Sequence, residues 1–314
     1  MPPPRRRLSR RERAVRAAAI AHLHGGVAHR RDLRMREVSR ADVRTEVAAG
    51  RWTRCGRHTV LIGTGAPTGP ALWWHAVWES GSGSRLDGVA ALEASGLTGF
   101  EAPAIDVSIP SNNRRHRVQG VRLHQRSLMP PAGAAGVPRV DVPYAAVHAA
   151  VWAATDRQAA LVLCLVLQQR LTTPSRLLVA WAASTVRVGR RRRAFLDDVL
   201  RDLCDGAHSL GELDFAGMCR GHGLPEPSRQ VVRTLPGGRV YLDVCWEDIG
   251  LAVEIDGGQH ALALNTVDDA LRQNEVVLGG SRVLRIPVVG LRLSPDRFMA
   301  QVVDAHRRWS RGVA

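Results

Sequence analysis

The first sixty residues place apolar positions at helical spacing between short stretches of glycine and polar residues. This spacing predicts a helix over residues 12–23, ended by the Gly25-Gly26 pair, and a shorter helix over residues 29–35. The apolar positions of the first helix are Val15, Ala18, Ile20 and Leu23. The chain therefore opens with two helices joined by a glycine turn.

A third helical pattern begins at Ser39. The hydroxyl of Ser39 suits an N-cap, with Asp42 three residues later in the position of the capping-box acid. Val43 and Val47 supply an inward apolar face. Gly50 predicts the end of this helix.

Residues 51–54 and 58–62 have the pattern of a short hairpin, or wing, after the third helix. In winged helix-turn-helix units the third helix enters the major groove, and wing arginines meet phosphates or the minor groove. The expected DNA contacts are the outward arginines of the third helix and those of the wing, namely Arg40, Arg44, Arg51, Arg54 and Arg57. A helical hairpin with a merely solvated basic face is the alternative.

The middle of the chain mixes helical and strand-like patterns. The expected helices are 72–79 and 144–171, and the expected strands are 105–109 and 118–124. Between the two strands lie Arg114, Arg115 and Arg117, either at a solvated hairpin tip or in a loop that contacts phosphate. This α+β region carries the weakest functional signal of the chain.

An arginine cluster at residues 187–193 precedes a new helical pattern and predicts a hinge. We therefore expect three domains, covering residues 1–65, 66–190 and 191–314. The last domain has the most regular pattern, in the order α-β-β-β-α-β-α, which favours an α/β fold. Its expected elements are helix 210–219, strands 229–235, 239–246 and 251–256, helix 268–278, strand 282–286 and helix 296–309.

Acidic residues lie inside the apolar hairpin of this domain. If residues 248–249 form a two-residue loop, counting outward places Asp243 directly opposite Glu254, and Asp256 lies on the same face. Two carboxylates so close repel each other unless a cation offsets the repulsion. Mg²⁺ (or Mn²⁺) takes one or two carboxylates together with phosphate oxygens. A solvated sheet edge, or pairing with Arg272 or Arg285, is the alternative.

The charge balance points to a polyanionic partner. The formal net charge is +15, and all 44 basic side chains are arginines. DNA is favoured over a membrane because the longest apolar run, residues 159–167, is too short to span a bilayer. The five cysteines are scattered, so neither disulfides nor a structural zinc site is expected. The sequence has no secretory pattern, so we expect a cytoplasmic protein.

The N-terminal pattern resembles the N-terminal domain of the AbiEi-type antitoxin family. The similar residues are Gly25-Gly26-Val27, Arg51-Trp52 and Val60-Leu61-Ile62, and the likeness covers roughly the first fifth of the chain. In that family such domains usually bind promoter DNA, which supports the winged helix-turn-helix interpretation.

The C-terminal pattern resembles the domain related to the very-short-patch-repair endonuclease, within the restriction-endonuclease-like PD-(D/E)XK superfamily. The likeness covers residues 209–288 and centres on the string from Glu254 to His260. It implies a restriction-endonuclease-like α-β-β-β-α-β core with Asp243 and Glu254 as metal ligands. The other implied catalytic residues are Glu212, Asp256, His260 and Arg272.

The superfamily lysine is missing, and Asp256 stands where it would fall. The resemblance therefore assigns His260 the role of general base or water-positioning group, although a surface role is the alternative. Arg272 would stabilise charge on the scissile phosphate.

These observations predict a metal-dependent DNA endonuclease that the winged helix recruits to DNA, in repair or defence. The alternative is a DNA-binding regulator of antitoxin type with a degenerate nuclease fold. RNA processing is less favoured because aromatic residues make up only 4% of the chain and supply no evident stacking platform. DNA is the expected partner, no membrane association is expected, and a homodimer is left open.

Overall fold

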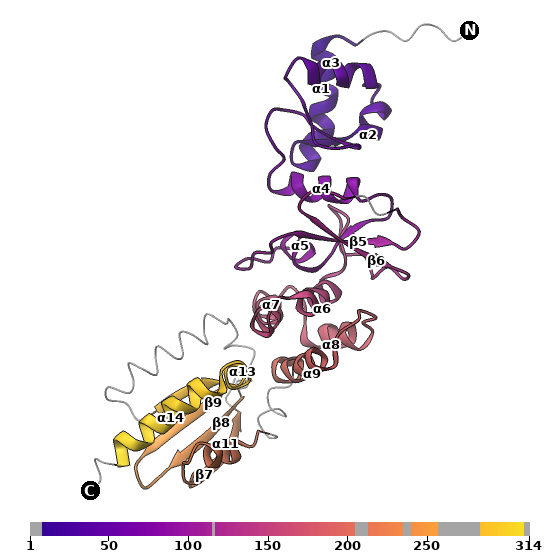
Figure 1. Ribbon diagram of the computed structural model, residues 1–314. Helices are drawn as coiled ribbons and strands as arrows, with labels where there is room; N and C mark the ends of the chain where they lie inside the picture. The colour runs from indigo at the N-terminus through magenta and orange to yellow at the C-terminus, as the bar shows by residue number, and fades with distance from the viewer. Residues whose placement is uncertain (1–7, 115–116, 205–212, 235–239, 257–282, 311–314) are drawn as a thin grey trace. The chain divides into compact units, whose positions relative to one another are not determined.

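The computed structural model of the protein describes residues 8–114, 117–204, 213–234, 240–256 and 283–310, which form a mixed α/β structure (Figure 1). The contacts divide the chain into two compact units. Unit 1 comprises Met1–Gly96 and Phe100–Ala145, and unit 2 comprises Leu97–Gly99 and Ala146–Ala314. The boundary near residue 145 falls inside the predicted middle domain, and the division into three domains stays a prediction. Among the helices that the structure describes, none combines the length and apolar character needed to cross a membrane.

Unit 1 begins with three short helices and a small sheet. The elements are α1 (Arg10–Ala21), η1 (His22–His24), β1 (Val27–His29), α2 (Arg30–Met35), α3 (Arg40–Ala48), β2 (Thr53–Arg54) and β3 (Thr59–Leu61). The strands pair antiparallel in the order β1-β3-β2. Their core contains Leu8, Ala17, Ile20, Ala28, Leu33, Val38, Val43, Trp52 and Val60.

The three predicted helices of this segment are confirmed, with two corrections. Strand β1 replaces the expected helix start at His29, because residues 27–29 pair with β3. Of the four positions expected on the apolar side of the first helix, Ile20 is buried as predicted, but Ala18 is exposed, and Val15 and Leu23 are 63% and 72% exposed. The buried side of α1 consists instead of Ala17, Ile20 and Ala21.

The rest of unit 1 surrounds a second sheet. The elements are α4 (Pro70–Glu79), β4 (Arg85–Leu86), α5 (Gly88–Glu93), β5 (Ile105–Pro110) and β6 (Val121–Arg126), with the strand order β4-β5-β6. Strands β5 and β6 run parallel, so the interpretation of the connection that carries Arg114 and Arg117 as a hairpin tip is wrong. Arg115 lies outside the described residues.

Four helices lead into the C-terminal sheet: α6 (Val142–Trp152), α7 (Asp156–Gln168), α8 (Pro174–Ala182) and α9 (Arg190–Cys204). The single helix expected over residues 144–171 is wrong. Helix α6 ends at Trp152. Thr155 is the N-cap of α7, and its side chain accepts a hydrogen bond from the backbone N–H of Gln158. Helix α9 packs on α7 and α8.

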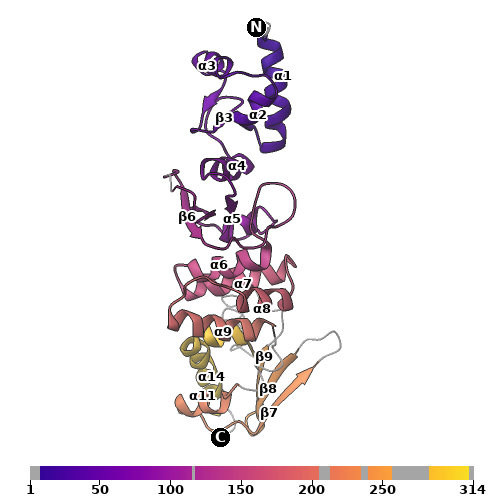
Figure 2. The ribbon, with the colours of Figure 1, turned by 90° about the vertical axis from the view of Figure 1, so that its right-hand side faces the viewer.

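The C-terminal elements are α11 (Phe215–Gly221), β7 (Arg229–Thr234), β8 (Val240–Trp246), β9 (Leu251–Asp256), β10 (Val283–Pro287), α13 (Val288–Leu293) and α14 (Pro295–Ser310). The sheet order is β10-β9-β8-β7, with β10 parallel to β9 and the other pairs antiparallel. Figure 2 shows β9, β8 and β7 side by side. The four strands and the last helix match the sequence prediction closely. Helix α13 was missed, and the predicted helix 268–278 lies outside the described residues.

A charged pair joins α9 to the C-terminal elements. Asp202 is 1% exposed, and its carboxylate accepts hydrogen bonds from Nε and Nη2 of Arg292 on α13. Burial alone would lower the pKa of Arg292, but the bond to Asp202 together with the negative charges of Asp202 and Asp198 outweighs it and raises the pKa. A second carboxylate, that of Asp198, lies 3.4 Å from Nη1. Arg292 thus links α9 to α13, the helix that directly follows strand β10.

We predict that Arg292→Met lowers the free energy of unfolding of unit 2 by about 3 kcal/mol, because it leaves the carboxylate of Asp202 buried and uncompensated. Denaturant unfolding followed by circular dichroism measures this. The control is Arg307→Met on the exposed side of α14, which should stay within about 0.5 kcal/mol of wild type. Equal stability of the two variants would contradict a structural role for the pair.

Candidate functional site

Asp243 and Glu254 face each other directly across strands β8 and β9. The predicted hairpin count is confirmed, since Trp246 pairs with Leu251 and the N–H of Gly250 donates to the carbonyl of Glu247 at 3.3 Å. The same cross-strand row continues to Val231 on β7 and to Arg285 on β10. The sheet therefore carries two acids side by side, flanked by a valine and an arginine.

The alternation of side chains along the strands explains which face the acids occupy. The members of β8 and β9 that are at most 2% exposed are Leu242, Val244, Trp246, Leu251, Val253 and Ile255. Helix α14 packs on β9 (Figure 1), and its Phe298, Met299 and Val302 are buried. Asp243, Glu254 and Asp256 alternate with these residues and are partly exposed on the opposite face. We call that face the acid face.

Glu254 has a cationic neighbour. Arg285 pairs with it in the register of β10 and β9, and its Nε donates to Oε2 of Glu254 at 3.1 Å. One of the alternatives left open by the sequence, pairing with Arg285, is therefore present in the structure. The pair is partly solvated, with side-chain exposures of 59% for Arg285 and 27% for Glu254. Solvated pairs contribute only about 0–1 kcal/mol, so a divalent cation could compete with the guanidinium.

The carboxylates of the acid face suit a magnesium ion that takes only one or two of its ligands from the protein. Mg²⁺ commonly binds one or two carboxylates and completes its shell with water and phosphate oxygens. Asp243 and Glu254 supply such a pair. In the described part of the chain, no three His, Cys, Asp or Glu side chains converge on one point in a way that could hold a metal. Glu212, His260 and Arg272 lie outside the described residues, and their predicted roles stay predictions.

The N-terminal basic surface centres on α3. The predicted capping box is present: the backbone N–H of Asp42 donates to Oγ of Ser39 at 3.1 Å, and the backbone N–H of Ser39 donates to Oδ2 of Asp42 at 2.9 Å. Arg40 and Arg44 are exposed, as predicted. Arg54 and Arg57 are exposed on β2 and in the β2–β3 connection. Four of the five arginines expected to contact DNA therefore lie on the surface.

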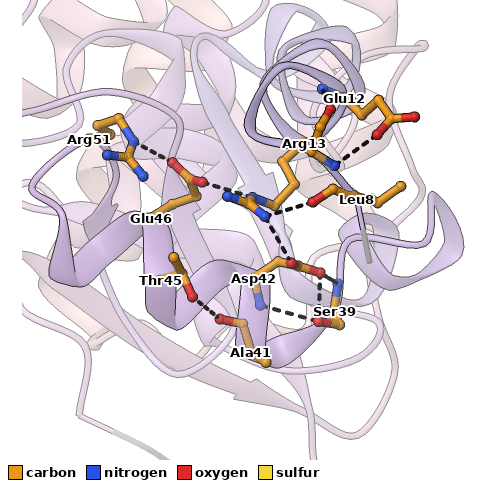
Figure 3. Close-up of polar contacts among 10 residues, drawn as sticks. Leu8, Glu12, Arg13, Ser39, Ala41, Asp42, Thr45, Glu46 and Arg51 are labelled. Atoms are coloured by element: carbon orange, nitrogen blue, oxygen red, sulfur yellow. Dashed lines mark hydrogen bonds and ion pairs between the residues drawn. The ribbon is translucent and has the colours of Figure 1, made fainter. Parts of the chain in front are cut away.

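Arg51 has a structural partner that the sequence analysis missed (Figure 3). Its Nε donates to Oε2 of Glu46 at 2.6 Å, while Nε of Arg13 on α1 donates to Oε1 at 2.8 Å. The hydrogen bond from Arg51 is the main reason that the pKa of Glu46, which is 3% exposed, lies below its usual value. Arg13 also bonds the carbonyl of Leu8 at 2.8 Å. Arg13 thus links α1 to α3 through Glu46, and the predicted DNA contact of Arg51 competes with its bond to the same carboxylate.

The β2–β3 connection is fastened to α4 by Glu79. The carboxylate of Glu79 accepts backbone N–H groups from Arg57, His58 and Thr59 at 2.7–2.9 Å, and the hydroxyl of Thr59 at 2.8 Å. Burial alone would raise the pKa of Glu79, but the bonds from the Thr59 hydroxyl and the His58 and Arg57 backbones, with the charge interaction of His75, outweigh it and lower the pKa. A Cβ at Gly56 would lie 2.4 Å from the carboxyl carbon, so only glycine fits there. We call this arrangement the Glu79 clamp.

Arg30 is a further basic residue that sequence reasoning missed. It begins α2, and its Nε is buried without a hydrogen-bond partner among the described residues. Burial, and then repulsion from Arg54 and Arg40, lowers its pKa. Arginines from α2, α3 and β2 therefore repel one another. A bound phosphate would offset this repulsion.

No protein-family model matches this chain, and no curated protein is found to match it. Both resemblances drawn from the sequence therefore stay predictions. The functional argument depends on the acid face and on the basic N-terminal surface.

We predict that Glu46→Gln lowers the stability of the α1–α3 segment by about 1–3 kcal/mol near pH 7, because two guanidinium groups lose their charged acceptor. The folded-state pKa of Glu46 is lowered, so its contribution is complete above the unfolded pKa of about 4.3 and is lost as the pH falls through the folded value. The difference between wild type and variant should therefore shrink below about pH 4.3.

Hydrogen–deuterium exchange of the α3 amides, corrected for the pH dependence of intrinsic exchange, measures this effect locally. Glu37→Gln is the matched control, since Glu37 pairs with Arg16 but its side chain is 74% exposed. A difference between wild type and Glu46→Gln that stays constant from pH 7 to pH 3 would contradict the linkage.

Proposed function

We propose that this protein is a divalent-metal-dependent DNA endonuclease whose active centre is the acid face. The observation that carries the proposal is the direct opposition of Asp243 and Glu254 on the solvent-accessible side of the sheet. Opposed carboxylates destabilise a sheet. Two opposed acids, with Asp256 as a third on the same face, concentrate negative charge where a divalent cation could bind.

In this proposal Asp243 and Glu254 hold the cation. A bound Mg²⁺ would supply Lewis-acid polarisation of the scissile phosphate. Arg285 already lies beside Glu254 and would present a guanidinium to the phosphate once the cation takes over the carboxylate. His260 and Arg272 keep the roles that the resemblance implies, base or water-positioning group and charge stabilisation, within a restriction-endonuclease-like core.

The N-terminal segment would deliver this centre to DNA as a winged helix-turn-helix. Support comes from the order of α1, α2, α3 and a β2–β3 hairpin, together with exposed arginines on α3 and the hairpin. The formal charge of +15 supplies attraction to phosphate without sequence preference.

We predict Mg²⁺- or Mn²⁺-dependent cleavage of DNA by the purified chain, reduced at least 100-fold in Asp243→Asn and in Glu254→Gln because each loses a charged metal ligand. The assay compares duplex, mismatched, branched and single-stranded DNA, with and without EDTA. Asp248→Asn is the matched control, because Asp248 is an exposed acid in the turn of the same hairpin. If no substrate is cut with either metal, the enzymatic proposal fails.

A second candidate function is favoured by the pairing of Glu254 with Arg285. An arginine that already compensates one of the two acids is what a degenerate nuclease fold would keep for stability. The protein would then act as a DNA-binding regulator of antitoxin type. Protection of the chain's own promoter, unaffected by Asp243→Asn, would favour this function over cleavage.

Both functions require DNA binding by α3. We predict that replacing Arg40 and Arg44 together by alanine weakens duplex binding at least 10-fold and reduces the slope of log K against log salt by about 2, since each lost phosphate contact removes about 0.9. Fluorescence anisotropy across a salt series measures both quantities. Arg11→Ala on the exposed side of α1 should change neither. An unchanged slope in the double variant would remove α3 from the interface.

A further inference from the structure

Unit 1 contains a cleft that the proposed functions do not use. It has a volume of about 450 Å³ and lies between the start of α2, the β2–β3 connection and the end of α4. Its walls include His29, Arg31, His58, Trp78 and the loop from Gly81 to Arg85. This volume falls in the range of small-molecule sites, about 300–1,000 Å³.

One wall of the cleft is aromatic. The rings of His29 and His58 lie nearly parallel, with centroids 5.7 Å apart and an interplanar angle of 8°. Trp78 meets His29 edge to face at 5.4 Å and lies against Trp74 at 5.1 Å. Contacts on several sides hold these rings in place, so they form a preset surface for a flat ligand.

A buried hydroxyl in the same cleft lacks a partner. Ser84 is 3% exposed, and its Oγ has no hydrogen-bond partner among the described residues. The loop that holds it is fixed by Asn113, whose Nδ2 donates to the carbonyl of Ser82 at 2.8 Å. Gly83 has a φ of +74°, and a Cβ there would lie 3.1 Å from the ring of Pro110. A buried polar group without a partner is costly, and a ligand would satisfy it.

The charge of the lining favours an anion. Arg31 is exposed at the mouth, and its backbone N–H donates to Nδ1 of His29 at 3.1 Å. Burial lowers the pKa of His29, which keeps this ring neutral and available for stacking at pH 7. The nearest acids are Asp32, on α2 beside His29, and Glu79, whose carboxylate is saturated by four donors in the Glu79 clamp. Arg31 is therefore left to face solvent.

We propose that this cleft binds a nucleotide, with the base on the wall formed by His29, His58 and Trp78, the phosphate on Arg31, and a polar edge on the hydroxyl of Ser84. Stacking of a base on an aromatic side chain and capture of its phosphate by arginine are the two recognition modes that such a lining offers. The nucleotide could be free or could belong to a single strand. The cleft would act in this way whether or not the acid face cleaves DNA.

Isothermal titration of the full chain with AMP, and separately with a 5′-phosphorylated single-stranded tetranucleotide, tests the proposal. We expect saturable binding of at least one of them, and binding of adenosine or of inorganic phosphate about 10-fold weaker or undetectable. Binding of AMP indicates a free nucleotide as the ligand, and binding of the tetranucleotide alone indicates a strand. Absence of binding in both titrations overturns the proposal.

Variants separate a ligand site from a structural cavity. Arg31→Gln and Ser84→Ala should each weaken nucleotide binding about 10-fold. Arg34→Gln, an exposed arginine of α2 outside the cleft, should leave it unchanged. Since the Ser84 hydroxyl has no hydrogen-bond partner in the part of the chain that the structure describes, Ser84→Ala should keep or raise the melting temperature of the ligand-free protein. A variant that melts lower and binds the nucleotide normally would show a structural role for Ser84 and overturn the proposal.

Discussion

The opposition of Asp243 and Glu254 across one hairpin is the constraint from which the functional reading of this protein follows. Their register cannot shift by one residue, because the same strands hold Leu242, Val244, Val253 and Ile255 against α14. The apolar face therefore fixes the acids on the other side. Correct packing of the core therefore keeps the two acids opposed, and the guanidinium of Arg285 offsets part of the charge on Glu254.

Four buried acids elsewhere in the described chain are paired with arginine. Glu46, Asp87, Asp106 and Asp202 are each at most 5% exposed, and each lies within 4.0 Å of at least one arginine nitrogen. A chain without lysine satisfies its buried carboxylates with guanidinium groups, whose fork of donors suits such pairing. Asp243 and Glu254 are partly exposed, and the residue directly opposite each across β8 and β9 is another acid. Glu254 also lies within 4.0 Å of an arginine nitrogen, so the acid face differs from the buried pairs in its exposure and in the second acid opposite.

Sequence reasoning succeeded where a few neighbouring residues decide the structure. The two-residue loop at 248–249 gave the register of the acid hairpin, and the spacing of Ser39 and Asp42 gave the start of α3. It failed where distant residues decide. The Glu79 clamp joins residues about twenty positions apart, and the parallel pairing of β5 with β6 has no local signal that separates it from a hairpin. Arg51 was assigned to DNA because the buried acid it binds, Glu46, could not be told from a surface glutamate.

The absence of lysine also limits the chemistry that the acid face could perform. A guanidinium stays protonated at any pH a protein survives, so Arg285 can position a phosphate or offset its charge but cannot accept a proton. If the acid face hydrolyses a phosphodiester bond, the proton of the attacking water must go to a carboxylate, an imidazole or a phosphate oxygen. Asp256 lies two residues beyond Glu254 on the same face of β9, in register with Tyr241, and it stands where the superfamily that the sequence resembles has its lysine. If the resemblance holds, Asp256 would place a proton acceptor where the superfamily has a cation, which would change the mechanism without by itself removing it.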